Sequence, residues 1–422
     1  MTMAAKLEPV PAGFDREMDA LRELSARVGG EPLLVQASNG NTSIKIDGTL
    51  WIKASGRWLA HATREEMFMG VGLAAVRRSL RHGTGIPARH DATSDLRPSI
   101  ETPMHAAIPH RVVIHVHSIN AISWAIRLDG PEQIKDRLEG LHWQWIPYAP
   151  SGNPLAREIA KAAERAPETN VFILGSHGLV VCGRDCASAE KLLREVDWRL
   201  ALPPRRFPKP NLDALQAVAR FPGWEFPEVR AVHALATDPR CRNIVQSGVL
   251  YPCQAIFLGQ KLSCIPAWIA ESRFAEWLAV QPRVPQFVAV EGVGVMINKK
   301  ITSAERATLR ALAEVTLRVA DSAPLRYLTD REVAEVLAQG AHGGKDVIVM
   351  PERTSGVPHY VTRYVRHSMT HSLTDSLTHS LTYSLDMGRK SLDNLNACAA
   401  WLGSHSRKLR SRIASARTGL GA

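Results

Sequence analysis

Two histidines lie two residues apart at the end of an apolar run, in the segment 111–118 that reads RVVIHVHS. Side chains at positions i and i+2 of a β-strand leave it on the same face, so the rings of His115 and His117 can converge on one point. A third histidine, His177, follows another apolar run, and an acid, Glu101, precedes the pair. Three neutral imidazoles with one open position are the ligand set of a catalytic divalent metal, zinc above all. The pattern predicts a metal centre; ordinary strand histidines are the alternative.

The length of 422 residues allows two or three domains, and a hydrophobic content of 45% supports a sizeable core. No apolar run reaches the roughly 18 residues of a membrane-spanning helix, so no membrane partner is expected. The segment 1–14 has one lysine and no apolar centre, which is unlike a secretory signal. The six cysteines form no C-x-x-C pair, which indicates reduced thiols and predicts a cytoplasmic location.

The net charge of +11 is concentrated at one end of the chain. Residues 361–422 hold nine lysines and arginines against three acids, which gives +6 of the +11. Residues 367–386 are low-complexity, with a four-residue period rich in Ser and Thr. We expect this basic tail to be disordered and dispensable. It could contact RNA or lipid, but a solvated tail is favoured and a nucleic-acid partner is not expected.

Hydrophobic periodicity divides the rest of the chain in two. Helices are expected over 13–30, 154–166 and 186–200, with another opening at 99–105, and strands around 33–36, 42–46 and 50–54 with a hairpin at Asp47-Gly48. This alternation predicts an α/β sandwich in a first domain, residues 1–202, which the proline-rich segment 203–210 ends. A second unit of unknown role, 211–345, combines a β-rich run at 287–297 with an amphipathic helix at 303–320. Its glycine clusters at 292–294 and 340–346 do not match a nucleotide loop and are expected to be turns.

Six short motifs occur in a fixed order: GNTS at 40–43, KASG at 53–56, PSIE at 98–101, HVH at 115–117, PYA at 147–149 and SHG at 176–178. In these residues the chain resembles the class II aldolase/adducin family, the fold of fuculose-phosphate and rhamnulose-phosphate aldolases, over about residues 13–200. The resemblance implies a three-layer α/β/α sandwich with a mainly antiparallel central sheet. A smaller α+β unit would follow it. The resemblance also implies a homo-oligomer, most simply a tetramer.

The resemblance assigns roles residue by residue. His115, His117 and His177 match the zinc-binding histidines, for Zn²⁺ or another divalent ion such as Mn²⁺. Glu101 matches the acid that ligates the resting metal and then carries a proton. Tyr148 matches the tyrosine, donated across a subunit boundary, that protonates the aldehyde. The positions that cradle a substrate phosphate match Asn41, Ser55, Gly56 and Ser99.

Each of these residues also has a structural interpretation. Glu101 suits the start of a helix, Ser99 could be a helix N-cap, and Tyr148 could be a core tyrosine. His105, four residues after Glu101, could support the site or be a satisfied core histidine. The sugar-phosphate aldolases tend to have two serines before the acid, whereas this chain has Ser99-Ile100. Lys53, on the same strand face as Ser55, could read a phosphate or carboxylate instead, or be a surface lysine.

The predicted function is a divalent-metal-dependent lyase that performs retro-aldol cleavage of a small sugar-derived ketose or ketose phosphate. A metal ion chelated by the ketose oxygens stabilises the enediolate, and Glu101 and Tyr148 serve as proton carriers. An epimerase, decarboxylase or dehydratase of the same family would use the same metal site. A non-catalytic, adducin-like assembly protein is the alternative from another class, although such members have lost metal ligands.

Overall fold

The computed structural model describes residues 13–84, 96–260 and 262–341. All of these residues belong to one compact unit. The predictions for the basic tail, and for most of the glycine cluster at 340–346, lie outside the described residues. No helix in the described part is long and apolar enough to cross a membrane.

A seven-stranded sheet forms the centre of the first part, in the order β3-β2-β1-β4-β7-β6-β5. β5 and β6 run parallel, and the other neighbouring strands run antiparallel, as the sequence led us to expect. The strands are β1 (Asn41–Ile46), β2 (Thr49–Lys53), β3 (Phe68–Gly72), β4 (Val112–Val116), β5 (Trp143–Ile146), β6 (Val171–Leu174) and β7 (Gly178–Gly183).

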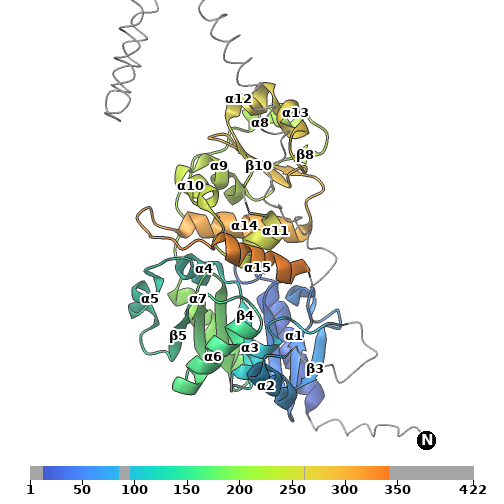
Figure 1. Cartoon of the computed structure of the whole chain (residues 1–422), viewed down its shortest axis with the longest axis vertical. Coiled ribbons are helices and arrows are strands. Elements are labelled where there is room, and N and C mark those ends of the chain that lie inside the picture. The colour runs from blue at the N-terminus through green and yellow to red at the C-terminus, as the bar shows by residue number, and fades with distance from the viewer. Residues whose placement is uncertain (1–12, 85–95, 261, 342–422) are drawn as a thin grey trace, which may run out of the picture. The chain divides into compact units, whose positions relative to one another are not determined.

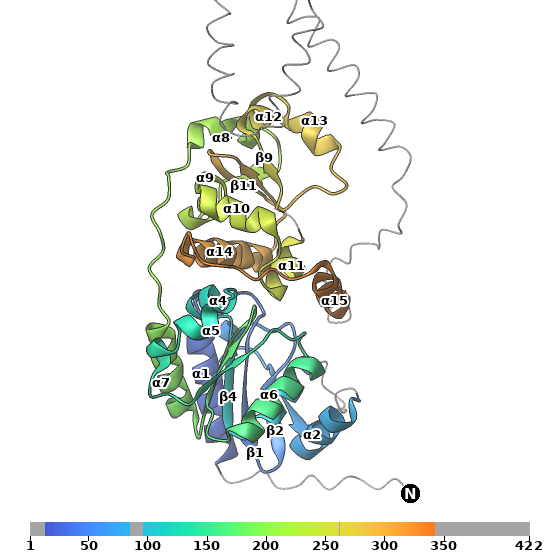
Figure 2. The same ribbon diagram turned by 60° about the vertical axis from the view of Figure 1, so that its left-hand side comes forward.

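Helices cover both faces of this sheet and complete the three-layer α/β/α sandwich (Figure 2). The alternation along β4 shows why: Ile114 and Val116 pack into the cluster on one face, and Val113 packs into the cluster on the other. The first face carries α1 (Phe14–Gly29), α4 (Ile119–Ala125) and α7 (Cys186–Arg199), and the second carries α2 (Leu73–His82), α3 (Thr102–Ala107) and α6 (Asn153–Arg165). A short helix, α5 (Gly130–Gln133), follows α4.

Local sequence signals explain several of these elements. Asp47 and Gly48 have φ of 43° and 77° and join β1 to β2 with Ile46 opposite Thr49, the geometry of a tight two-residue hairpin. The side chain of Asp185 caps α7 by accepting from the Ser188 backbone N–H. The strand expected around 33–36 is wrong: this segment is a turn in which the Leu34 N–H bonds the Glu31 carbonyl.

The second part of the chain contains a four-stranded sheet in the order β8-β11-β10-β9 (Figure 1). Its strands are β8 (Trp224–Glu225), β9 (Cys264–Ile265), β10 (Phe287–Val290) and β11 (Gly294–Asn298). The turn expected at 292–294 lies at 291–293, and Gly294 begins β11. Its helices are α8 (Leu212–Ala219), α9 (Ala234–Thr237), α10 (Pro239–Ser247), α11 (Pro252–Leu258), α12 (Ala267–Ser272), α13 (Phe274–Ala279), α14 (Ser303–Arg318) and α15 (Asp330–Ala341). Among the short 3₁₀ helices, η1 (Leu59–His61) and η2 (Asp136–Leu138) lie in the first part of the chain and η3 (Arg230–His233) lies in the second.

The two parts share one hydrophobic cluster. Ile119 and Ile122 of α4 are buried in the same cluster as Leu312 of α14. Backbone hydrogen bonds join the parts as well: the Leu128 N–H donates to the Pro324 carbonyl at 2.9 Å. The aldolase-like segment and the segment that follows it therefore bury apolar surface against each other.

Replacing Ile122 by alanine should lower the free energy of unfolding by about 2–5 kcal/mol, because it removes a fully buried side chain that both parts contact. Leu128→Ala, at a side chain that is 63% exposed, is the control and should have little effect. Denaturant unfolding of the full chain measures the free energy of unfolding of both variants. Two separate transitions, of which Ile122→Ala shifts one alone, would show that the two parts unfold independently.

Candidate metal centre

The three predicted histidines meet at one end of the central sheet. His115 is on β4, His117 directly follows that strand, and His177 lies in the tight turn between β6 and β7. Their ring centroids are 5.0–5.2 Å apart, and one nitrogen from each lies within 4.8 Å of the others. All three side chains are buried. The structure thus brings these residues together in the arrangement that a metal ion requires.

Two glycines allow neighbouring segments of the backbone to lie close to the end of β4, where His115 and His117 are. A Cβ on Gly178 would lie 2.6 Å from the Val116 carbonyl oxygen, so a side chain there would push β7 away from the end of β4. Gly40 has a φ of +68°, and a Cβ there would lie 2.8 Å from the His115 carbonyl oxygen.

Glu101, which directly precedes α3, faces two of the histidines. Its Oε2 lies 3.4 Å from His115 Nε2, and its Oε1 lies 3.3 Å from His177 Nε2. Burial opposes ionisation of this carboxyl, but its interactions with His115 and His177 outweigh burial and hold its pKa well below the usual range. Glu101 is therefore an ionised carboxylate beside the three rings.

Two of the histidines, His115 and His117, are held neutral, as metal ligands must be. Burial lowers the pKa of His115 to about 4 and lowers the pKa of His117 well below its usual value. His115 Nδ1 donates to the Leu179 carbonyl at 3.1 Å, which leaves Nε2 as the nitrogen with a free lone pair. That Nε2 is buried and has no hydrogen-bond partner among the described residues. A metal ion is the partner that suits a buried, unprotonated imidazole nitrogen beside a carboxylate.

A hydrogen-bond network supports the carboxylate from β1. Asn41 lies opposite His115 in the sheet register, and its Nδ2 donates to Glu101 Oε2 at 2.8 Å. The Asn41 side-chain oxygen in turn bonds His105 Nε2, and His105 Nδ1 bonds Ser43 Oγ at 2.7 Å. Burial lowers the pKa of His105 well below its usual value, so the ring is neutral and can accept one bond and donate the other. His105 orients Asn41 toward Glu101; sequence reasoning favoured a core histidine at this position.

The predicted anion-binding residues lie on neighbouring loops. Ser99 Oγ accepts from the Glu101 backbone N–H at 3.2 Å and lies 3.4 Å from Asn41 Nδ2. Ser55 and Gly56 are exposed, and the Ser55 N–H donates to the Arg97 carbonyl at 2.9 Å, next to the Pro98-Ser99 segment. Their role in binding a substrate anion stays a prediction.

Lys53 is buried, and its ammonium donates hydrogen bonds to the carbonyls of Ser38 and Arg57, each at 2.7 Å. Burial lowers its pKa to about 7. These two bonds join the loop that precedes Asn41 to the loop that contains Gly56. Lys53 is thus a cross-link between the two loops, and the prediction that it reads a substrate anion stays a prediction.

Tyr148 follows β5 and packs against the second part of the chain. Its ring lies in a cluster with Val249 and Val333, and the Arg326 guanidinium lies 4.6 Å from the ring centroid. Its hydroxyl is buried without a partner in the described part of the chain, and burial raises its pKa to about 12. The phenol is therefore protonated at neutral pH.

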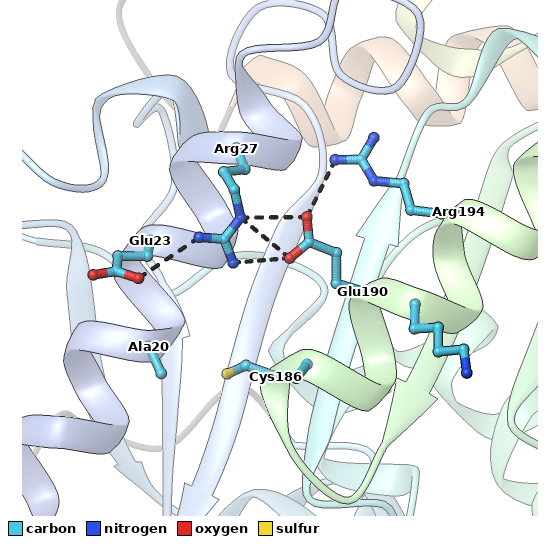
Figure 3. A pocket seen from close by; sticks show the side chains of 8 residues that line it. Ala20, Glu23, Arg27, Cys186, Glu190 and Arg194 are labelled. Carbon is cyan, nitrogen blue, oxygen red and sulfur yellow. Dashed lines mark hydrogen bonds and ion pairs between the residues drawn. The ribbon is translucent and has the colours of Figure 1, made fainter.

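A hollow of about 360 Å³ on the surface between α1 and α7 is a separate feature (Figure 3). Three of its charged side chains are paired with one another, because Glu190 binds both Arg27, at 2.8 Å, and Arg194, at 3.2 Å. Burial raises the pKa of the Cys186 thiol in this hollow to about 11, which disfavours the reactive thiolate. The histidine cluster is the better candidate for chemistry.

Comparison with known proteins agrees with the motifs. Residues 20–202 match the family described as Class II Aldolase and Adducin N-terminal domain. A methylthioribulose-1-phosphate dehydratase from Enterobacter sp. is 28% identical over 200 residues, which cover 43% of this chain and 88% of that protein. The uncharacterized oxidoreductase YuxG of Bacillus subtilis is 28% identical over 194 residues, which cover 41% of this chain and only 27% of that protein.

Among solved structures, the N-terminal class II aldolase domain of a conserved protein from Thermoplasma acidophilum aligns with 47% of this chain and 98% of its own length. It is 23% identical, with a TM-score of 0.38. The resemblance that the six motifs indicate is confirmed by the family match. Residues 20–202 of this chain are thus similar to the class II aldolase and adducin N-terminal domain.

Proposed function

We propose that this protein is a divalent-metal-dependent lyase that cleaves a carbon–carbon bond of a small sugar-derived ketose or ketose phosphate by a retro-aldol reaction. The observation that carries the proposal is the His115 Nε2 lone pair, buried without a hydrogen-bond partner among the described residues and 3.4 Å from an ionised Glu101. His117 and His177 offer two further nitrogens within 4.8 Å. This donor set fits Zn²⁺, or another divalent ion such as Mn²⁺.

His115, His117 and His177 would hold the metal, with Glu101 as a further ligand in the resting state. When bound, the metal supplies a Lewis acid that polarises the substrate carbonyl and stabilises negative charge on its oxygens. Glu101, ionised and oriented by Asn41, accepts the proton of the substrate hydroxyl and later returns it.

Tyr148 is proposed as the second acid. With its pKa raised to about 12, its phenol keeps its proton at neutral pH and can donate a hydrogen bond to the oxygen that becomes the aldehyde carbonyl, while Glu101 carries the proton of that hydroxyl to the carbon of the other fragment. Family resemblance suggests that this tyrosine serves a neighbouring subunit, so we propose a homo-oligomer, most simply a tetramer. Asn41, Ser55, Gly56 and Ser99 are the proposed contacts for a substrate anion. A cytoplasmic location is supported by the cysteines that the structure describes, which are free thiols.

A dehydratase is the second candidate, because a relative that matches over 88% of its own length is a methylthioribulose-1-phosphate dehydratase. The same metal and the same Glu101 would serve that reaction, as they would in an epimerase or decarboxylase. Products separate the two leading candidates: retro-aldol cleavage yields two smaller carbonyl compounds, whereas dehydration yields one product that has lost water. A non-catalytic, adducin-like role is disfavoured because all three histidines and Glu101 are present.

We expect about one equivalent of a divalent metal per chain in protein purified without chelator, since three buried imidazoles converge beside a carboxylate. Elemental analysis measures the content. Alanine at His115, His117 or His177 should abolish loading. His110→Ala, at a histidine that instead bonds the Thr169 carbonyl, is the matched control and should keep the metal. Wild-type protein that stays metal-free after incubation with zinc and manganese would overturn the proposal.

Glu101→Gln should keep most of the metal but lose activity, because the amide cannot take up the substrate proton. The expected loss in kcat is about 10²–10⁴-fold, the usual contribution of a general acid–base group. Steady-state kinetics on a panel of ketose phosphates, free ketoses and sugar acids provides the measurement. Near-normal turnover of this variant on the true substrate would make Glu101 a structural residue.

Tyr148→Phe should fold and keep metal but lose turnover, since it removes only the hydroxyl. If the tyrosine serves a neighbouring subunit, mixing this variant with Glu101→Gln should restore part of the activity in mixed oligomers. Light scattering of the wild-type protein tests the oligomer itself. A fully active monomer would exclude the proposed donation between subunits.

A further inference from the structure

The second part of the chain touches one of the histidines directly. Cys253, the second residue of α11, is buried, and its Sγ lies 3.4 Å from His117 Nδ1. This distance is within the range of a hydrogen bond to sulfur. Position 253 lies outside the segment 20–202 that matches the aldolase family, so the family match assigns it no role.

The contact between Cys253 and His117 is similar to a contact that β7 makes with His115. There the Leu179 carbonyl accepts from Nδ1, which fixes the tautomer and leaves Nε2 for the site. A thiol sulfur that accepts from His117 Nδ1 leaves Nε2 of that ring unprotonated in the same way. Metal-binding histidines usually have such a partner on the other ring nitrogen, which sets the orientation of the ring. His177 lacks one among the described residues, since its Nδ1 is unpartnered.

The backbone around Cys253 is fixed. The fully buried side chain of Gln254 accepts from the Leu250 N–H at 2.9 Å, and so ties the start of α11 to the preceding segment. The Leu328 N–H donates to the Val249 carbonyl at 2.8 Å. α11 also packs against α14, whose Leu312 lies in the cluster shared with α4. The sulfur is therefore held against His117 by packing on several sides.

A second, separate contact links the same part of the chain to the site. Arg326 Nη1 lies 3.5 Å from Ser176 Oγ, on the residue that precedes His177. The backbone N–H of Arg326 donates to the Ile126 carbonyl at 2.8 Å, and its guanidinium binds Glu332 at 2.6 Å. The segment 249–332 thus reaches the neighbourhood of both His117 and His177.

We propose that Cys253 is a positioning residue for the metal centre: its sulfur accepts a hydrogen bond from His117 Nδ1 and so fixes the tautomer and ring orientation in which His117 binds the metal through Nε2. This inference rests on the metal site proposed above. It assigns part of the support of that site to the second part of the same chain.

The test is the zinc affinity of the full chain, measured by competition with a chelator that reports free metal. Cys253→Ala should weaken zinc binding by about 10–100-fold, the usual effect of removing such a partner. Cys253→Ser, whose hydroxyl can still accept from Nδ1, should recover part of the loss. Cys241→Ala is the matched control: that thiol is also buried in the second part but lies beside Arg205, so its loss should leave zinc affinity unchanged.

Cobalt substitution separates a positioning thiol from a ligand. If Cys253 only contacts His117, the Co²⁺ protein shows no intense sulfur-to-cobalt charge-transfer absorption, and the Cys253→Ala spectrum matches the wild type in that region. A charge-transfer band that Cys253→Ala removes would make Cys253 a direct ligand and overturn the proposal. Unchanged zinc affinity in Cys253→Ala overturns it as well. Failure of wild-type protein to bind metal would instead overturn the proposed function.

Discussion

The interaction on which this structure depends is the burial of the Glu101 carboxylate beside three imidazole rings. An ionised group inside a protein is costly unless charge or hydrogen bonds compensate it. Glu101 has part of this compensation from Asn41, which donates a hydrogen bond to it, beside the rings of His115 and His177. The central sheet supplies these partners from neighbouring strands, and α3 supplies the acid. A bound divalent cation would complete the compensation, which is why the cluster is better explained as a metal site than as ordinary core packing.

Periodicity along single elements predicted much of this from the sequence. The two-residue period of β4 places His115 and His117 together, and Asp47-Gly48 specifies its own hairpin. Where local signals are weak, prediction was wrong: the apolar residues at 33–36 form a turn, because their backbone bonds Glu31 rather than a neighbouring strand. Apolar character alone cannot distinguish a strand from a buried turn.

Contacts between distant segments could not be predicted. His105 was expected to be a core histidine; its role in orienting Asn41 depends on how α3 crosses β1. Lys53 was expected to bind an anion or to be a surface lysine; it is buried instead of lying at the surface, and its bonds to two loop carbonyls depend on how both loops fold. Cys253 carried no sequence signal at all, since nothing in α11 indicates that it packs beside His117. Spatial neighbours of this kind follow from the packing of the whole chain. The shared cluster around Ile122 shows that the second part is joined to the aldolase-like segment.

X-ray absorption at the zinc edge of the zinc-loaded full-length protein tests the central claim most directly, because it reports the atoms around the metal. The account predicts a shell of nitrogen and oxygen ligands at about 2.0–2.2 Å, with the outer-atom scattering of imidazole rings and no sulfur at about 2.3 Å. That imidazole scattering should fall in His115→Ala protein if any zinc remains bound. A shell of oxygen atoms alone, without imidazole scattering, would show that the metal lies elsewhere and would contradict the account.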